Sequence, residues 1–334
     1  MKRLLAALAL GAAAIIGATP ALAQKTVTFA YQDMMNPWRY VQQTGEIEKA
    51  TGFKINWRQF GGGGDVIRAM ASGDVQLGEV GSTGVATAIS QGMDVDLFWI
   101  LEDIAAAEAL VARNGSGVNT IADLKGKKVG TPFVSTSHFQ LLYAMQQAGL
   151  KPGDVQVLNM RPPEIAAAWG RGDIDATFIW DPVLTTVKKT GKVLMTSGDI
   201  CKKGACTFDG LIVTKKFAQE NPAFMVALVK ALGKADADYR ANPKAWTSDK
   251  AKVDAVAKWS GGKPEDVADS MALYGFPSLQ EQASPAWLGG GANGAATKAL
   301  SQQANFLKEQ GRLTSVAPDF SKNVTTEWVT KAMQ

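Results

Sequence analysis

Short polar runs that follow apolar segments hold the residues whose chemistry suits a charged ligand. The run Gly81-Ser82-Thr83 follows one apolar segment, and Ser135-Thr136-Ser137 comes shortly after another at residues 127–131. A helix that begins at such a run offers hydroxyls and free N–H groups to an anion. Asp209 instead interrupts the apolar stretch 207–214, where a buried carboxylate needs a compensating cation. The sequence thus offers donors for a negative group and an acid for a positive one.

The hydroxyls have a second interpretation, because capping the following helix is the commonest use of serine and threonine at such a place. One hydroxyl can cap while its neighbour binds, so both interpretations stay open. His138 is the sole histidine, and no Cys, Asp or Glu stands near it at ligand spacing. The sequence therefore predicts no metal site and no catalytic residue.

A repeated unit is expected to position these groups. Residues 66–92 have the pattern of a helix, a short strand and a second helix, and residues 166–191 repeat this pattern 99 positions later. In this overlay Gly81-Ser82-Thr83 corresponds to Trp180-Asp181-Pro182. Two such units facing each other would form a cleft, whereas two ordinary units of an α/β protein without a ligand are the alternative.

Strand and helix patterns alternate along the rest of the chain, which predicts an α/β architecture with mainly parallel sheets and a helical C-terminal tail. Strands are expected at residues 25–31, 54–58, 75–80, 97–100, 109–112, 127–131 and 207–214, and helices at 38–50, 221–240, 250–259, 265–272 and 295–309. The glycine run 61–64 lacks the Gly-Lys-Ser/Thr ending of a phosphate-binding loop and is expected to be a mobile loop, with Asp65 capping the next helix. A ligand cradle is the alternative for this run.

Residues 1–23 have the features of a signal peptide. Lys2 and Arg3 precede an apolar run, and Ala21-Leu22-Ala23 is an A-x-A signal that predicts cleavage after Ala23 and export to the periplasm. The apolar run is shorter than the roughly 20 residues of a spanning helix, although an uncleaved anchor is the alternative. Without Lys2 and Arg3 the chain has 33 basic and 31 acidic residues, which gives no indication of nucleic-acid binding. About 310 mature residues predict two lobes.

Cys201 and Cys206 are the only cysteines. In an exported protein, two cysteines this close predict a local disulfide, because the compartment is oxidising. A redox role is the alternative, but it usually requires the spacing C-x-x-C.

Several stretches resemble the nitrate, sulfonate and taurine branch of periplasmic solute-binding proteins. The resemblance covers nearly the whole mature chain, and the order and spacing of the motifs are more specific than any single one. The matching stretches are VTFAYQ at 27–32, IRAMASGDVQ at 67–76, Gly81-Ser82, EALV at 108–111, PFVSTSH at 132–138, Pro162-Pro163, AAW at 167–169, RGDID at 171–175, Trp180, Pro182, Asp209 and FLKEQG at 306–311.

This resemblance implies a type II periplasmic binding-protein fold, in which two α/β lobes and two hinge crossings enclose a ligand. The crossings are expected near residues 108–111 and 209–213. Lobe I would then contain residues 24–108 and 211–334, and lobe II residues 109–210. The resemblance also implies delivery of the loaded form to a membrane permease and its ATPase, and the chain itself carries no ATP motif. A monomer is expected.

The implied ligand is a small zwitterionic sulfonate, taurine. The resemblance places Ser82, Thr83, Thr136 and Ser137 at the sulfonate, Glu108 and Asp209 at the ammonium, and Gln32 and Trp180 along the cleft walls. A sulfonate stays ionised and has three acceptor oxygens, which suits hydroxyls and N–H groups at helix N-termini. The alternatives are a surface salt bridge for Glu108 and core packing for Trp180.

Asp181 departs from the family pattern, because an apolar residue usually follows the tryptophan. An inward-facing Asp181 would repel a sulfonate or add a further acid for a more cationic ligand. Other alkanesulfonates and small quaternary ammonium compounds are therefore alternative ligands. A cofactor-biosynthesis enzyme on the same fold is the alternative function, but the chain offers no nucleophile or acid–base set and no cofactor motif.

Overall fold

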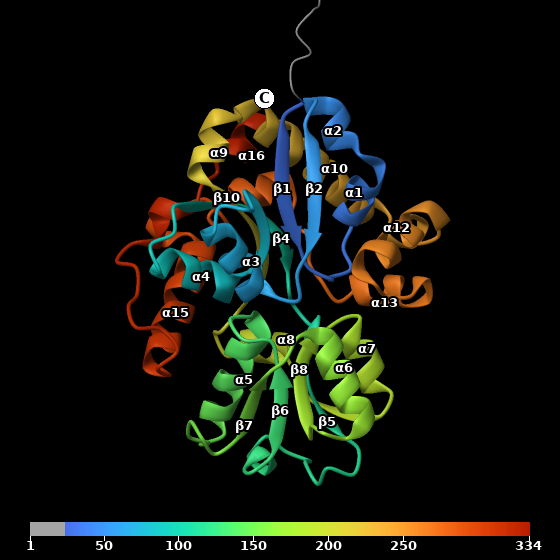
Figure 1. Cartoon of the computed structure of the whole chain (residues 1–334), viewed down its shortest axis with the longest axis vertical. Helices are drawn as coiled ribbons and strands as arrows, with labels where there is room; N and C mark the ends of the chain where they lie inside the picture. Colours follow the sequence, from blue (N-terminus) through green and yellow to red (C-terminus); the bar gives the residue numbers. More distant parts are fainter. Residues whose placement is uncertain (1–23) are drawn as a thin grey trace, which may run out of the picture.

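The computed structural model describes residues 24–334, which form two α/β lobes shown one above the other in Figure 1. The predicted signal peptide at 1–23 lies outside the described residues. The sheet of lobe I has the order β2-β1-β3-β10-β4, and that of lobe II the order β7-β6-β8-β5-β9. The strands of lobe I are β1 (Thr26–Tyr31), β2 (Lys54–Gln59), β3 (Leu77–Gly81), β4 (Val95–Asp103) and β10 (Phe208–Thr214). Those of lobe II are β5 (Glu108–Arg113), β6 (Lys128–Thr131), β7 (Gln156–Asn159), β8 (Ala176–Trp180) and β9 (Gly191–Thr196).

The two sheets have equivalent topologies. In each, the first three strands of the order are parallel and the fourth runs antiparallel to both of its neighbours. The predicted repeat is confirmed, because β3 and β8 are both the third strand of their sheets. The two-lobed α/β fold is confirmed as well, but both sheets are mixed rather than mainly parallel, because each has two parallel and two antiparallel pairings.

Helices cover the faces of both sheets (Figure 1). Those of lobe I are α1 (Trp38–Thr44), α2 (Glu46–Thr51), α3 (Gly63–Ala71), α4 (Ser82–Ser90), α9 (Lys215–Glu220), α10 (Pro222–Ala241), α11 (Pro243–Trp246), α12 (Lys250–Ser260), α13 (Val267–Met271), α14 (Leu279–Ala283), α15 (Ala295–Glu309) and α16 (Glu327–Ala332). Those of lobe II are α5 (Thr136–Gln147), α6 (Pro162–Arg171), α7 (Val183–Lys188) and α8 (Ser197–Cys201).

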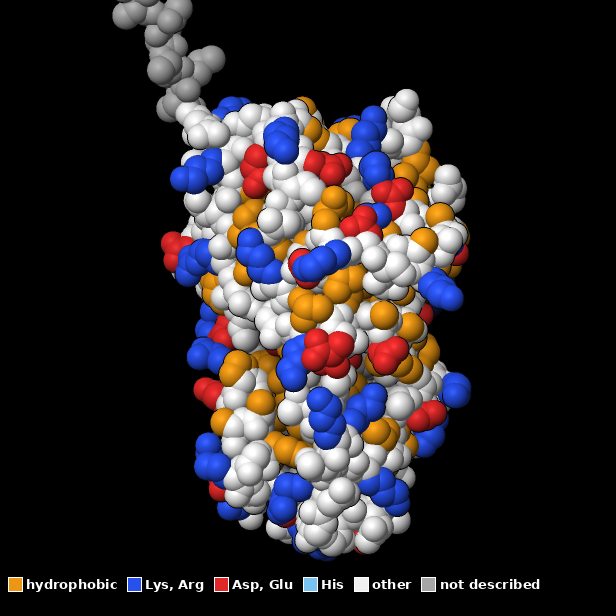
Figure 2. Space-filling model, turned by 90° about the vertical axis from the view of Figure 1, so that its right-hand side faces the viewer, with side chains coloured by type: hydrophobic (Ala, Val, Ile, Leu, Met, Phe, Trp, Pro, Cys, Tyr) orange, Lys and Arg blue, Asp and Glu red, His pale blue; other side chains and the backbone are white. Residues whose placement is uncertain are grey.

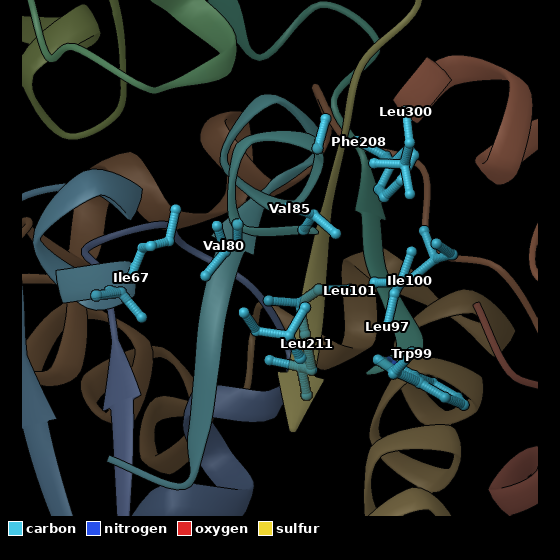
Figure 3. Packing of buried hydrophobic residues seen from close by; sticks show 14 of the residues in the cluster. Ile67, Val80, Val85, Leu97, Trp99, Ile100, Leu101, Phe208, Leu211 and Leu300 are labelled. Carbon is cyan, nitrogen blue, oxygen red and sulfur yellow. The ribbon is translucent and has the colours of Figure 1, made fainter. Parts of the chain in front are cut away.

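The core of lobe I surrounds β10 and its neighbours. Figure 3 shows Val80 of β3, Leu97 of β4 and Leu211 of β10 among the buried side chains. Val85 of α4 and Leu300 of α15 also belong to this cluster. Because helices cover both faces, these strands are apolar on both sides, which is typical of sheets in α/β proteins. Glu79, Glu102 and Asp209 on these strands are accordingly buried.

Two local expectations differ from the structure. The helix expected at 38–50 is two helices, α1 and α2, because Gly45 adopts a positive φ of 63° between them. Half of the glycine run, expected as a loop, belongs to α3, which begins at Gly63.

The chain passes between the sheets just before the two expected crossings. Residues 108–111 belong to β5 and residues 209–213 to β10, so the connections are residues 104–107 and the segment that follows α8. The predicted disulfide between Cys201 and Cys206 is present beside the second connection. The exact lobe boundaries stay a prediction.

The outer surface has mixed charge. On the face shown in Figure 2, basic and acidic side chains are interspersed along both lobes. Among residues 24–334, no helix combines the length and the apolar character needed to span a bilayer.

Candidate functional site

A small cavity lies between the lobes, at the ends of β3 and β8. Its lining comes from both lobes and consists of Gln32, Met34, Gly63, Gly81 and Asp209 on one side and Glu108, Ser135, Thr136 and Trp180 on the other. Five of the eight predicted ligand residues are thus brought together: Gln32, Glu108, Thr136, Trp180 and Asp209. The cavity volume of about 10 Å³ has room for about one water molecule. A larger ligand therefore requires the lobes to separate before it enters.

The two acids of this cavity occupy equivalent positions in the two lobes. Asp209 on β10 pairs with Gly81, the last residue of β3, whereas Glu108 on β5 pairs with Trp180, the last residue of β8. Asp209 is 5% exposed and Glu108 is 3% exposed. The local twofold repeat therefore brings one buried carboxyl from each lobe to the same cavity.

Glu108 is held by a hydroxyl of the same lobe. The Thr136 hydroxyl donates to its Oε1 over 2.5 Å, and its Oε2 has no hydrogen-bond partner among the described residues. Burial raises the pKa of Glu108 to about 7, although the hydrogen bond from Thr136 and the nearby Ser137 hydroxyl oppose this. A cation at Oε2 would satisfy the free oxygen and favour the ionised form.

Asp209 has more carboxyl groups close to it than Glu108 has. Burial raises its pKa well above the ordinary value, and the charges of Glu108 and Glu79 raise it further, against the opposing effect of Arg39. Its expected role as an acid needing a cation is therefore consistent with its surroundings.

Trp180 connects the lobes across the cavity. Its indole N–H, from the end of β8, donates to Asp33 Oδ1 over 2.6 Å, just after β1. Burial raises the pKa of Asp33 to about 6, and the bond from Trp180 lowers it. Gln32, next to Asp33, donates its amide to the Glu79 carbonyl over 2.9 Å. The Trp180–Asp33 contact therefore depends on the closed arrangement of the lobes, whereas the Gln32 bond lies within lobe I.

The N-termini of α4 and α5 meet at the cavity. A Cβ atom added to Gly81, which precedes α4, would lie 2.9 Å from Thr136 Cγ2 at the start of α5. Ser135 caps α5, because its hydroxyl accepts from the His138 N–H over 3.1 Å. The buried Ser137 hydroxyl has no partner among the described residues. Two helix N-termini in contact concentrate free N–H groups and positive dipole ends at one place.

Three predicted polar side chains are engaged elsewhere. The hydroxyls of Ser82 and Thr83 donate to Gln303 Oε1 of α15 over 3.0 and 2.7 Å, and neither residue lines the cavity. Asp181 accepts from the Thr185 N–H over 2.7 Å, so it binds the first turn of α7 and lies outside the cavity lining. Ser82 and Thr83 can therefore reach an anion through their backbone N–H groups only.

Sequence reasoning missed a buried group of charges behind the cavity. Arg39 of α1 contacts Glu79 of β3 over 2.8 Å, with both side chains fully buried. Glu102 of β4 is fully buried too and receives only the Asn36 amide, at 3.3 Å from each oxygen. Carboxylates inside the apolar patterns of β3 and β4 were the available signal, because such positions are costly without a purpose.

The glycine run lies against lobe II at the rim of the cleft. A Cβ atom at Gly64 would lie 3.3 Å from the Phe133 carbonyl oxygen, so glycine permits this close approach. Asp65 does not cap α3 as expected; it contacts Arg68 and accepts from Arg161 of lobe II over 2.9 Å. The adjoining hollow of about 460 Å³ is lined partly by exposed arginines, so we place the ligand site in the smaller cavity with buried polar groups.

His138 takes no part in the cavity. Its ring stacks on Phe133 with centroids 4.3 Å apart, and it is absent from the cavity lining. Burial, with a smaller contribution from Arg312, lowers the pKa of His138 to about 3. The side chain is therefore neutral and lacks the arrangement of a general base.

Known proteins are similar to this chain along most of its length. Residues 49–246 match the family described as NMT1/THI5 like. The taurine-binding periplasmic protein of Escherichia coli K12 is 38% identical over 303 residues, which cover 91% of this chain and 92% of that protein.

Solved structures share the fold. The alkanesulfonate-binding protein SsuA from Xanthomonas axonopodis pv. citri, bound to MOPS, matches with a TM-score of 0.69 at 22% identity, over 87% of this chain and 94% of that one. The desulfurization enzyme DSZB also matches, with a TM-score of 0.62 at 14% identity, over 92% and 99% of the two chains. At these identities the likeness extends to the fold alone.

Proposed function

The chain belongs to the NMT1/THI5-like family, and we propose that it is the substrate-binding protein of an ABC importer, with taurine as its ligand. The observation that carries this proposal is the pair of buried acids, Glu108 and Asp209, which face one cavity from equivalent places in the two lobes. An ammonium group between them would supply the donors that both carboxyls need. The 38% identity to a protein named for taurine binding supports the same ligand.

The sulfonate would bind where α4 and α5 meet. The Ser137 hydroxyl and the N–H groups of both first turns provide several donors within one region, and Thr136 would contribute its backbone N–H because its hydroxyl donates to Glu108. Ser82 and Thr83 would contribute backbone N–H groups, because Gln303 holds their hydroxyls. Gln32 and Trp180 would form the walls, and the ring of Trp180 can stabilise a cation by roughly 0.5 to 2 kcal/mol. A short zwitterion carries both a sulfonate for these donors and an ammonium for the acids beside them.

Other ligands fit less well. A longer alkanesulfonate without an amine would leave Glu108 and Asp209 without a cation, and a quaternary ammonium compound has no N–H to donate to them. Asp181 adds no third acid, because the α7 backbone holds its carboxylate outside the cavity lining. Taurine supplies both the ammonium donors and the sulfonate acceptors.

A transport role also fits better than catalysis. DSZB is an enzyme with this fold, but in the described part of this chain both cysteines form the disulfide and His138 stacks on Phe133. Among residues 24–334, neither a free thiol nor an imidazole base is therefore available to the cavity. We propose a monomer, exported to the periplasm after cleavage behind Ala23, that delivers its ligand to a permease and its ATPase.

Isothermal titration calorimetry of the mature protein tests this function. We expect one-site binding of taurine and weaker binding of ethanesulfonate, which lacks the ammonium and leaves buried acids unpaired. Equal affinity for the two compounds would remove Glu108 and Asp209 from the site. Heat release without saturable binding, or turnover of either compound, would contradict a binding protein.

A further inference from the structure

Glu102 and Asp209 lie next to each other on adjacent strands beside the cavity. The antiparallel pairing of β4 and β10 sets Asp209 opposite Glu102. In such a pair, Cβ atoms on one face are about 5 Å apart. Glu102 is fully buried and Asp209 is 5% exposed. Two carboxyls this close in a buried site cannot both ionise without a strong mutual penalty.

Arg39, the neighbouring cation, forms its ion pair with Glu79 and with neither acid of this pair. The Arg39 guanidinium contacts Glu79 over 2.8 Å and also donates to the carbonyls of Met34 and Gln32. Glu102 receives only an uncharged amide, and no described residue donates a hydrogen bond to the Asp209 carboxyl. The pair therefore lacks a direct positive partner within residues 24–334.

Two further polar atoms around the pair are free. Glu108 Oε2 and the Tyr274 hydroxyl are buried without a hydrogen-bond partner among the described residues. The charges of Glu102 and Asp209 both act on Tyr274, which shows that its hydroxyl lies near the pair. Buried polar atoms are normally satisfied. Only Glu108 lines the cavity, since Tyr274 lies outside its lining, so Glu108 Oε2 is the free atom that a donating ligand could reach.

The protonation of the pair follows from its surroundings. Burial is the largest effect raising the pKa of each acid, and their neighbours add to it: Asp209 and Glu79 for Glu102, and Glu108 and Glu79 for Asp209. Arg39 opposes these effects for both acids. The titratable and charged groups around the cavity are Asp33 after β1, Arg39 on α1, Glu79 on β3, Glu108 on β5, Asp181 after β8 and Tyr274 after α13.

We infer that Glu102 and Asp209 share one proton until a ligand cation arrives, and that an ammonium ligand displaces this proton when it binds. The inference rests on the proposed function, because it assigns a proton exchange to the same site. Glu102 is then a specificity-determining residue that acts through Asp209. Binding of taurine should become tighter as the pH rises, by up to about tenfold per pH unit while one full proton is released.

Calorimetric titration of taurine at pH 7 in phosphate and in Tris measures the proton release, because the two buffers take up protons with different enthalpies. The expected result is release of up to one proton per taurine bound, together with a dissociation constant that falls between pH 6 and pH 8. Taurine binding without proton release would overturn this inference and leave the proposed function intact. Absence of taurine binding would overturn both.

The Glu102→Gln variant assigns the proton to the pair. Its neutral side chain resembles protonated Glu102, so Asp209 should be ionised before the ligand arrives. The proton release and the pH slope should then fall to the part that Glu108, with a pKa of about 7, contributes. Glu220→Gln on the exposed part of α9 is the matched control and should behave as the unmodified protein. Undiminished proton release in Glu102→Gln would assign the proton to another group, such as Glu108, and contradict the inference.

Discussion

The ends of β3 and β8 occupy equivalent places in the two lobes, yet one ends in Gly81 and the other in Trp180. Each residue pairs with an acid on the neighbouring antiparallel strand, Asp209 and Glu108 respectively. Gly81 leaves space in which Thr136 of lobe II approaches, whereas Trp180 extends across the cleft to Asp33. The repeat thus places the two acids at equivalent positions, but the residues paired with them differ in size: Gly81 has no side chain, and Trp180 has a large one. A twofold scaffold can in this way hold an asymmetric molecule with two different ends.

Asp209→Asn should have the largest effect on this arrangement. Loss of the negative charge should weaken taurine binding by about 1 to 3 kcal/mol, because a hydrogen bond to a charged group is replaced by a weaker one. Calorimetry measures the change, with the exposed Asp254→Asn on α12 as a matched control. An unchanged dissociation constant would mean that the burial of Asp209 has another cause and that the two acids are not counterparts.

Gly81→Ala tests the need for space at the end of β3. Its Cβ would lie 2.9 Å from Thr136 Cγ2 and 3.1 Å from Asp209 Oδ1, so closure of the lobes should be impeded. We expect ligand binding to weaken by about 1 to 2 kcal/mol, a cost in the range of overpacking, with little change in thermal stability.

Gly170→Ala on α6 provides the control for this substitution, since a Cβ there would meet no atom within 4 Å. It should leave binding unchanged. If Gly81→Ala bound taurine as well as the unmodified protein did, the contact between the helix N-termini would not be part of the closed state.

The pH dependence of stability distinguishes the buried acids from ordinary surface acids. Burial raises the pKa of Glu108 to about 7 and of Asp33 to about 6, whereas both groups titrate near 4 in the unfolded chain. The folded protein therefore holds more protons between about pH 4 and 7, so their contribution to stability is lost as the pH rises through this range. Each group can contribute at most about 1.4 kcal/mol per pH unit.

Urea unfolding of the ligand-free protein at pH 5, 6 and 7 measures this dependence. We expect a lower midpoint at pH 7 than at pH 5, and a shallower dependence in Glu108→Gln. A midpoint that rises steadily from pH 5 to pH 7 would contradict the proposed protonation of the cavity acids.

Asp65→Asn at the rim should have the smallest effect. The contact between Asp65 and Arg161 joins the lobes, but the Arg161 side chain is 60% exposed, and exposed ion pairs contribute about 0.2 to 1 kcal/mol. We expect taurine binding to weaken slightly at low salt and to match the unmodified protein at high salt. A loss as large as that of Asp209→Asn would move the centre of the site to the rim.

Local patterns in the sequence predicted much of the fold and part of the site. The repeat at 66–92 and 166–191 correctly indicated two equivalent strand–helix units, and Asp209 within an apolar strand indicated a buried acid. Other features depend on distant parts of the chain. The hydroxyls of Ser82 and Thr83 donate to Gln303, which lies more than 200 residues away in the sequence. Glu102 joins Asp209 only because β10 inserts between β3 and β4.

A crystal structure of the mature protein with taurine tests the central claim most directly. The ammonium nitrogen should lie about 2.7 to 2.9 Å from a carboxylate oxygen of both Glu108 and Asp209. The sulfonate should face the N-termini of α4 and α5. Taurine bound in the opposite orientation, or bound at the rim beside Arg161, would contradict the account.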